Sequence, residues 1–572
     1  MALRCLLSRL LLGLVPLAVA STVYLYLYPV FKGCAYPLPQ RAPNATPQSS
    51  AFLGTLRKHF TSESAQGPEQ AIFRLLVLAD PQLEGDSSLP RGENELGARL
   101  QRHWENILTT IETAPHPLHN DVLNALSTAL QIFVLENLPR AFVAARKRLD
   151  LLGNDYYLAH IYRTLHWWTR PTHVTVLGDL LGSQWVTDGE FQRRGDRYWQ
   201  RVFRGGERID DEITRTGEKG YTGTGEQELL ELPPASAWAQ RIINVVGNHD
   251  IGYSGDASER RIERFERVFG RANWDIRFQH PPVASGKEGK SEHTPTLHVI
   301  NLNSLTLDTP PYSEEVLGHS YAYLNDIISQ RSYPVEDRTT FTLLLTHLPL
   351  HKRDSVCADG PYFTFFDADD ESEPQRYRAG GLREQNHLSD HISANGILQG
   401  IFGMSGGEVA AAPGSGRGRN GLILTGHDHT GCDVLHYIDT LPQTSQPSSQ
   451  GNDTATNSEK EQPTWTWNVK RYNPSDEQHL QLTTPSIREI TLRSMMGEYG
   501  GNAGLLSLWF DGDAAEWRYA IQMCPAGVQH IWWAVHVVDL ITLGVGVVHT
   551  LLQVCQSPTR SLPVIAGDKK TR

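Results

Sequence analysis

The feature that most constrains this chain is a series of short apolar runs, each of which ends in a cluster of polar residues. The six runs are residues 71–80, 173–179, 241–250, 296–304, 340–349 and 421–429. They are rich in Val, Ile, Leu and Thr and are too short for typical helices, so they predict buried strands of an α/β sheet. Helical patterns, for example residues 94–112 and 260–269, lie between them.

Five of these runs end in side chains of the kinds that bind metals. These side chains are Asp80 and Gln82, then Asp179, then Asn248 with His249 and Asp250, then His347, and finally His427 and His429. Sites in open α/β sheets gather at the carboxyl ends of strands, so we expect these residues to lie close together. Asp, Asn and His without a thiolate suit two divalent ions of intermediate hardness, such as Mn, Fe or Zn, that share a bridging carboxylate.

The order D-x-[H/Q], GD, GNHD, H and GHxH resembles that of the calcineurin-like metallophosphoesterase family, over about residues 71–437. Longer stretches around the motifs, among them VVGNHDIGY and LTGHDHTGCDVLHY, look like the fungal branch of the GPI-glycan ethanolamine-phosphate phosphodiesterases. The resemblance implies a four-layer αββα metallophosphoesterase sandwich, flanked here by two transmembrane helices.

The resemblance also implies roles for individual residues. The implied metal ligands are Asp80 and His429 for one ion, Asp179 as the bridge, and Asn248, His347 and His427 for the other ion. His249 is expected to lie over the phosphate and to stabilise or protonate the leaving oxygen, with Asp250 as its orienter. Gln82 stands where most of the family has a histidine ligand; its carbonyl oxygen is a weaker, harder ligand. Members of this branch use manganese, so the resemblance implies Mn, which a Gln82 oxygen also tolerates, with Fe and Zn as alternatives.

Residues 10–31 and 531–554 are long apolar stretches near the two ends of the chain. The first contains 22 uncharged residues, and as a helix it spans about 33 Å, enough for a bilayer core of ~30 Å. Arg4 and Arg9 precede it and predict a cytosolic N-terminus for a signal anchor. A cleaved signal peptide is the alternative, because a small-x-small pattern occurs within the stretch. Asp539 in the second stretch is expected to face a partner helix or the first span.

Two spans predict the organisation of the whole chain. The expected parts are a cytosolic N-terminus (1–9), a signal anchor (10–31), a lumenal stem (32–70), a lumenal metallophosphoesterase domain (71–525, with insertions at about 184–234 and 441–463), a second span (531–554) and a cytosolic tail (555–572). The tail ends in Lys569-Lys570-Thr571-Arg572, which looks like the dilysine signal read by the retrieval coat. We therefore expect an endoplasmic reticulum membrane protein that cycles with the Golgi. The apolar helical stretch at 121–151 is expected to be a buried core helix rather than a helix on the membrane surface.

Further candidate residues follow from a lumenal location. Candidate disulfides join Cys357 to Cys432 and Cys34 to Cys524, whereas Cys5 and Cys555 are expected to be free thiols, with palmitoylation as the alternative. Asn44 and Asn452 lie in N-glycosylation sequons. His351, Gln385 and His387 are candidate substrate contacts.

The net charge of −12 argues against a general nucleic-acid binder. The resemblance implies a metal-dependent phosphodiesterase that removes ethanolamine phosphate from a mannose of GPI anchors and so promotes the exit of GPI-anchored proteins. Its partners would be GPI glycans and the bilayer. Two alternatives stay open: a lumenal metallophosphatase for sugar phosphates, nucleotides or proteins, and a catalytically weak cargo-sorting membrane protein in which Gln82 marks a degenerate site.

Overall fold

The computed structural model describes most of the chain. The described residues are 2–37, 53–56, 72–85, 89–90, 92–113, 119–215, 237–280, 282–285, 291–331, 338–357, 360–369, 376–406, 417–440, 465–475 and 484–556. The sequons at Asn44 and Asn452, the insertion at 441–463, most of the stem and the dilysine sequence lie outside them. The chain divides into two compact units, Met1–Tyr28 with Gly527–Arg572, and Pro29–Ala526.

The first unit contains two helices, α1 (Ala2–Phe31) and α12 (Gln529–Gln556), which include both predicted spans. Both are long and apolar enough to cross a membrane. The Thr22 hydroxyl lies 3.1 and 3.3 Å from the two carboxylate oxygens of Asp539, so Asp539 faces α1. Ser8 and His549 are also within hydrogen-bond distance, at 2.9 Å. The two helices are therefore paired through polar groups as well as apolar ones.

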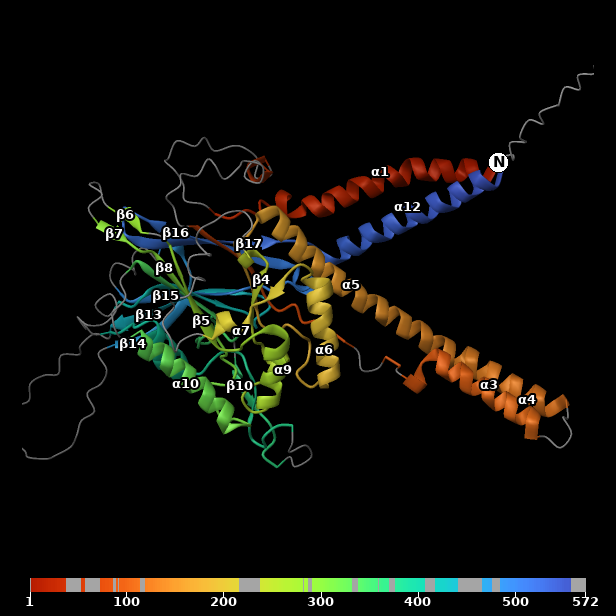
Figure 1. Ribbon diagram of the computed structural model, residues 1–572, viewed down its shortest axis with the longest axis horizontal. Coiled ribbons are helices and arrows are strands. Elements are labelled where there is room, and N and C mark those ends of the chain that lie inside the picture. Colours follow the sequence, from red (N-terminus) through yellow and green to blue (C-terminus); the bar gives the residue numbers. More distant parts are fainter. Residues whose placement is uncertain are drawn as a thin grey trace, which may run out of the picture. The chain divides into compact units, whose positions relative to one another are not determined.

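The second unit is built on two large sheets (Figure 1). The six-stranded sheet has the order β17-β16-β1-β2-β4-β3, with bounds Ile72–Leu78 (β1), His173–Leu177 (β2), Glu207–Arg208 (β3), Arg241–Val245 (β4), Asn502–Asp511 (β16) and Glu516–Pro525 (β17). The seven-stranded sheet has the order β14-β13-β15-β12-β9-β8-β5, with bounds Trp274–Gln279 (β5), Thr296–Leu302 (β8), Thr340–Thr346 (β9), Asn420–Thr425 (β12), Cys432–Thr440 (β13), Trp465–Arg471 (β14) and Ser486–Thr491 (β15). The two small hairpins are β6 (Val283–Ser285) with β7 (Ser291–His293), and β10 (Phe363–Phe365) with β11 (Leu382–Gln385). All six predicted strands are confirmed.

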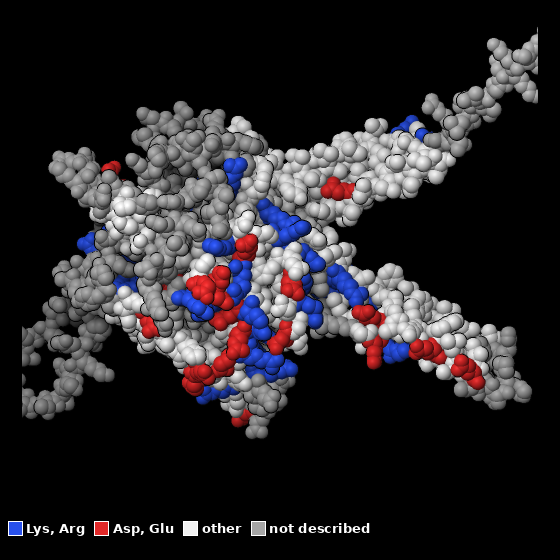
Figure 2. Space-filling view, in the orientation of Figure 1, with Lys and Arg blue, Asp and Glu red and all other residues white. Residues whose placement is uncertain are grey.

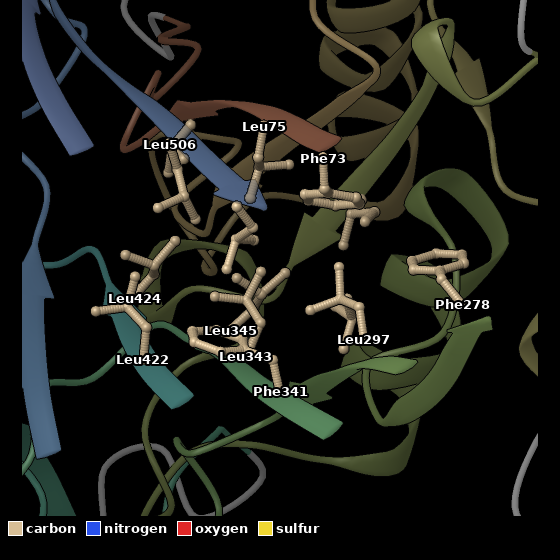
Figure 3. Packing of buried hydrophobic residues seen from close by; sticks show 14 of the residues in the cluster. Phe73, Leu75, Phe278, Leu297, Phe341, Leu343, Leu345, Leu422, Leu424 and Leu506 are labelled. Atoms are coloured by element: carbon tan, nitrogen blue, oxygen red, sulfur yellow. The ribbon is translucent and has the colours of Figure 1, made fainter. Parts of the chain in front are cut away.

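Alternate residues of the central strands form the core between the two sheets. Leu75 of β1 and Leu506 of β16 are fully buried, as are Leu343 of β9 and Leu424 of β12. Figure 3 shows these side chains between the two layers of strands. Each fully buried Leu contributes roughly 1.5–3 kcal/mol relative to an exposed one. This burial holds the parallel strands β1, β2 and β4 over the parallel strands β8, β9 and β12.

Helices cover the outer faces and complete the predicted αββα sandwich. On the first sheet, Asn244 of β4 accepts a 2.6 Å hydrogen bond from Tyr198 and donates one of 3.2 Å to the Phe269 carbonyl. These contacts join the sheet to η4 (Tyr198–Val202), which follows α6 (Asp188–Arg197), and to α9 (Glu259–Phe269). The second sheet carries α10 (Glu314–Gln330), with η7 (Ile392–Ile401) beside it. Residues 184–215 of the expected insertion are thus folded, and residues 216–236 lie outside the described part.

The prediction of a buried helix at 121–151 was wrong. This segment belongs to α4 (His119–Ile132), η3 (Phe133–Asn137) and α5 (Leu138–Thr169), which run on continuously beside α3 (Leu96–Thr113). Leu130 is 63% exposed and Phe142 is 68% exposed, and only the later part of α5 is buried. An apolar composition predicts that a helix is covered by something apolar. It does not show whether the covering is the protein's own core or lipid.

Two disulfides join distant parts of the second unit. Cys34 is bonded to Cys524 and Cys357 to Cys432, with Cα–Cα distances of 5.5 and 6.0 Å. The first bond ties the segment after α1 to the last strand of the six-stranded sheet. Among the described residues, Cys5 and Cys555 are free and exposed.

Candidate metal centre

The polar strand ends of both sheets meet at one edge of the sandwich. Asp80 follows β1, Asp179 follows β2 and Asn248 begins the short helix α8 (Asn248–Ile251) after β4. His347 follows β9 and His429 follows β12 in the other sheet. Because β1, β2 and β4 are parallel neighbours, as are β9 and β12, their carboxyl ends share an edge. One ligand atom each of Asp80, Asp179 and His429 lies within 4.8 Å of the other two.

The glycines of the motifs permit the strand ends to approach so closely. A Cβ on Gly247 would lie 1.9 Å from the backbone nitrogen of Asp179, and one on Gly178 would lie 2.3 Å from Nδ1 of His347. Neither backbone nor a buried ring can move aside cheaply. Four of the described non-glycine residues with positive φ are also here: Asp80, Gln82, Asp179 and His427. Such conformations cluster at functional sites, where the surrounding structure holds them in place.

The first cluster consists of Asp80, Gln82, Asp179 and His429. The Gln82 amide group lies 3.0 Å from Asp179 Oδ2 and 3.1 Å from His429 Nε2. Asp80 Oδ1 accepts a hydrogen bond from the His427 N–H, whereas its buried Oδ2 has no protein partner. A buried carboxylate oxygen without a donor is costly in a protein interior unless a cation neutralises it. This oxygen therefore fits a metal ion.

The second cluster consists of Asn248, His347 and His427. Asn248 Oδ1 lies 2.9 Å from His347 Nε2 and 3.0 Å from His427 Nδ1. The opposite nitrogens of the two rings donate to carbonyls, His347 Nδ1 to Leu177 at 2.8 Å and His427 Nε2 to Gln385 at 2.9 Å. A neutral imidazole has one N–H, so both inward nitrogens are acceptors that face an acceptor oxygen. Carbonyl contacts of this kind orient histidine ligands of metals, and the cluster fits a second ion.

Burial sets the charge of these groups. Burial lowers the pKa of His347. Burial, together with the nearby His347 ring, lowers the pKa of His427 to about 3. Both rings are therefore neutral, as histidine ligands of metals must be. Burial and then the Asp179 charge raise the pKa of Asp80 well above its usual value. Burial also acts to raise the pKa of Asp179, but His347 and His249 outweigh it, and the net direction is down. Asp179 is the carboxylate most favoured as an anion.

The residues of the GNHD sequence face in different directions. The His249 backbone N–H donates to Asp179 Oδ1 at 2.8 Å, and its 38% exposed ring has Nε2 3.8 Å from Asp179 Oδ2. The Asp250 carboxylate is buried and accepts hydrogen bonds from the N–H groups of Leu180, Leu181 and Gly247 at 3.2, 2.9 and 2.8 Å. Asp250 thus ties the loops after β2 and β4 together and does not contact the His249 ring through any of these bonds.

The three candidate substrate contacts lie in different surroundings. Gln385 supports His427 through its carbonyl, and its side chain donates to Asp308 at 3.2 Å. His351 lines a separate cavity with Trp467, and its ring packs against that of His387 with the ring centroids 4.9 Å apart. His387 is nearly fully buried and lines a pocket of about 330 Å³ that also includes His427 and His429. Of the three, His387 borders the pocket beside the metal centre.

Sequence reasoning missed several supporting groups. The carbonyls of Leu177 and Gln385 orient two imidazoles, but a backbone carbonyl has no sequence signature. Lys352 lines the same pocket and is paired at 2.8 Å with the buried Glu489 of β15. Glu489 also contacts His436 at 2.6 Å. These partners are far apart in sequence, so no local pattern could have identified them.

The chain as a whole is similar to several known proteins. Protein TED1 of Saccharomyces cerevisiae is 32% identical over 69% of this chain and 77% of that protein. An uncharacterised protein of Schizosaccharomyces pombe is 26% identical over 68% of this chain and 78% of its own length, and Metallophosphoesterase 1 of Cricetulus griseus is 23% identical over 52% and 60%. No family model matches. A solved structure of GAP50, the anchor in the inner membrane complex of Plasmodium, aligns over 80% of this chain and 85% of its own with 8% identity and a TM-score of 0.29, too weak a similarity to bear on the fold.

Proposed function

The chain belongs to the metallophosphoesterase family, in the fungal branch that includes Protein TED1, and we propose that it is a membrane-anchored, metal-dependent phosphodiesterase. The observation that carries this proposal is the convergence of two ring nitrogens on one amide oxygen: His347 Nε2 lies 2.9 Å and His427 Nδ1 lies 3.0 Å from Asn248 Oδ1. With the Asn248 amide oxygen directed at the two nitrogens, three acceptors face one another, and a cation would satisfy all of them.

The residues of the two clusters would hold two divalent ions. Asp80 and His429 would bind the first ion. Gln82 would also bind it through its carbonyl oxygen, once the amide is turned so that this oxygen faces Asp179. The second ion would be held by Asn248, His347 and His427, with Asp179 shared by both. When bound, such ions supply positive charge that activates water and neutralises phosphate oxygens. The hard Gln82 oxygen favours Mn for the first ion.

His249 is the group that we propose gives a proton to the leaving oxygen. Its backbone is fixed by the hydrogen bond to Asp179, while its ring is 38% exposed and stands beside the same carboxylate. The ring can therefore reach a substrate that approaches from solvent, and an imidazole exchanges protons readily near neutral pH. Asp250 holds the backbone of this loop, so we propose that it positions His249 through the main chain.

The proposed substrate is ethanolamine phosphate on a mannose of a GPI anchor, whose removal would promote exit of GPI-anchored proteins. Support comes from the resemblance of the motif sequences and from the pocket of about 330 Å³ beside His427 and His429. This volume suits a sugar-sized group. Asn386 and Thr430 in its lining offer hydrogen bonds to hydroxyls, and Asp428 offers a negative charge to an ethanolamine ammonium.

We propose that α1 and α12 span the endoplasmic reticulum membrane, with both termini cytosolic and residues 32–525 lumenal. Their length and apolar composition support the spans. The bond of Thr22 to Asp539 supports two helices that pair in lipid, where a carboxyl group needs a polar partner. Disulfides persist in oxidising compartments, so the two cystines support a lumenal domain.

The substrate proposal is tested by mass spectrometry of GPI glycans from cells whose only copy of the gene encodes His249→Ala. We expect ethanolamine phosphate to be retained on a mannose, and GPI-anchored proteins to leave the endoplasmic reticulum slowly. The matched control is His319→Ala, which removes an exposed imidazole on α10 and should leave the glycans unchanged. Normal glycan side branches in the His249→Ala cells would overturn the GPI assignment while leaving phosphoester hydrolysis open to its own assay.

A further inference from the structure

The metal centre does not include the helical arm, defined here as α3 together with α4, η3 and residues 138–152 of α5. Figure 1 shows α3 and α4 beside the far part of α5, away from the two sheets. Beyond the arm, the residues of α5 from Tyr157 to Leu165 are buried, except Arg163. One continuous helix thus passes from a packed base into an exposed arm.

Large apolar side chains form a continuous stripe along this helix. They recur every three or four residues, which places them on one side of the helix. The stripe begins with Leu123, Leu126, Leu130, Val134, Leu138 and Phe142, all exposed. It continues through Leu149 to Tyr156, so at 1.5 Å per residue it is about 50 Å long. Soluble proteins rarely leave so long an apolar surface in water.

The shielded side of the helix carries mostly small residues, together with the half-buried Ile132 and Phe133. Ala125 and Ala129 are half-buried, and Ala144 is buried. The buried Asn137 amide lies 3.3 Å from His103 of α3, which shows that this side faces α3. Paired helices in water place their large apolar residues between them. Small residues and a polar contact between helices, with large apolar residues outside, are the pattern of helices in lipid.

The second helix of the arm repeats this arrangement. Leu96, Leu100, Trp104 and Leu108 of α3 recur every four residues and are exposed, whereas Ile107 is buried. The face of the arm seen in Figure 2 is mostly uncharged along its outer part, with separate patches of acidic side chains. Both helices of the arm therefore present apolar side chains away from their shared contact.

Charge distinguishes a bilayer from a second protein as the occupant of this surface. Residues 122–135 contain no charged side chain, but Arg140, Arg146, Lys147 and Arg148 follow toward the base of the arm. There Arg148 lines a pocket of about 270 Å³. The other lining residues are Gly85, Leu89, Leu151, Leu152, Glu190 and three arginines, Arg193, Arg197 and Arg201, of which the first pairs with Glu190 and the other two pair with Asp155 of α5. Phospholipids present acyl chains next to phosphates, which matches an apolar stripe that leads into a cluster of arginines.

We propose that the arm is a membrane-seating element whose apolar stripe lies in the lipid interface and whose basal arginines face phospholipid headgroups. The same chain carries two helices apolar enough to cross a membrane, so a lipid bilayer is the apolar environment that the arm would meet. The inference does not depend on what the metal centre hydrolyses.

Seating the arm would also fix the metal centre relative to the membrane. Lys147 at the base of the arm lies 3.9 Å from Glu84, two residues beyond Gln82 on the loop after β1. Arg197 donates to the Glu84 carbonyl at 2.7 Å and pairs with Asp155 of α5 at 2.6 Å. The arm is thus linked by the Lys147–Glu84 pair to the loop that carries candidate metal ligands, so seating the arm would also position that loop relative to the lipid.

The test uses the full chain, reconstituted in phospholipid nanodiscs, with a spin label at one new cysteine. Cys5 and Cys555, the free cysteines among the described residues, are first replaced by serine. Leu130→Cys labels the stripe, and the matched control Thr128→Cys labels an exposed polar position more than a quarter-turn away on the same helix. We expect collisions with lipid-soluble oxygen to exceed those with a water-soluble nickel complex at 130, and the order to reverse at 128.

Three results would overturn the proposal. Nickel collisions that dominate at both positions would show that the stripe lies in water. Strong dipolar coupling between labels at 130 on two chains would show that a second copy covers it. Equal oxygen access at both positions would contradict seating by one face. Because Leu130 is 63% exposed, its replacement removes little packing, and unchanged thermal unfolding of the labelled variants verifies that the fold is intact.

Discussion

Glu489 of β15 holds one of the loops that carry the candidate ligands, and its replacement should destabilise the protein. Its carboxylate is fully buried. Oε1 accepts hydrogen bonds from Lys352 Nζ at 2.8 Å and from the Leu350 N–H at 3.2 Å, and Oε2 lies 2.6 Å from His436. Leu350 and Lys352 follow His347 on the loop after β9, so the carboxylate fixes the path of that loop.

The magnitude follows from the pKa of Glu489. Burial acts to raise it, but Lys352 and His436 outweigh burial and lower the pKa from 4.5 to about 2. That lowering corresponds to about 3 kcal/mol of stability. Because the folded-state pKa is the lower one, this stability is present above pH 4.5 and is lost as the pH falls toward 2.

The perturbation is Glu489→Gln, which leaves the ammonium of Lys352 buried without its counter-charge. We expect a loss of about 3–5 kcal/mol in the free energy of unfolding at pH 7. The assay is denaturant unfolding of the full chain in detergent, followed by tryptophan fluorescence. The wild-type protein should lose stability between pH 4.5 and 3 more steeply than the variant, which lacks the carboxylate.

The double variant Lys352→Met with Glu489→Gln provides the control. It removes both charges, so it should recover most of the stability that Glu489→Gln alone loses. A loss below about 1 kcal/mol for Glu489→Gln, or a double variant that is destabilised by the sum of the two single losses, would refute the reasoning from a buried ion pair.

Three further predictions concern the metal centre. We expect His249→Ala to lower phosphodiester hydrolysis by about 10²–10⁴-fold with metal content unchanged; loss of metal, measured by mass spectrometry of the elements, would instead mark it as a ligand. We expect Gly247→Ala to lose both metal and thermal stability, because its Cβ would meet the Asp179 nitrogen at 1.9 Å; Gly318→Ala, whose Cβ would meet nothing within 4 Å, should retain both. We expect Gln82→His to bind zinc more tightly than the wild-type protein in a chelator competition; an unchanged zinc affinity would show that residue 82 does not bind the ion.

Six of the strands and the clustering of their polar ends could be predicted from the sequence because both depend on local signals. Each apolar run is followed by its polar residues within a few positions, and parallel strands bring their carboxyl ends together whatever the rest of the chain does. Gly178 and Gly247 mark points where the backbone must approach another group. Such steric requirements are local, and the sequence records them directly.

The features that sequence reasoning missed depend on distant partners. Asp250 was expected to orient the His249 ring, but its carboxylate binds three backbone N–H groups of two loops. Glu489 and Lys352 pair across 137 positions of sequence. Residues 121–151 were predicted to be buried because apolar periodicity is the same for a helix that faces protein and one that faces lipid. None of these contacts leaves a pattern within a short window of sequence.

The metal content and hydrolytic activity of the purified full chain test the central claim most directly. The wild-type protein should contain close to two equivalents of Mn, Fe or Zn and should cleave a generic phosphodiester. Asp179→Asn should lose metal and activity together, because Asp179 would be shared by both ions, whereas Asp326→Asn on the exposed face of α10 should change neither. A wild-type chain that holds none of these metals, and stays inactive when Mn is added, would contradict the account.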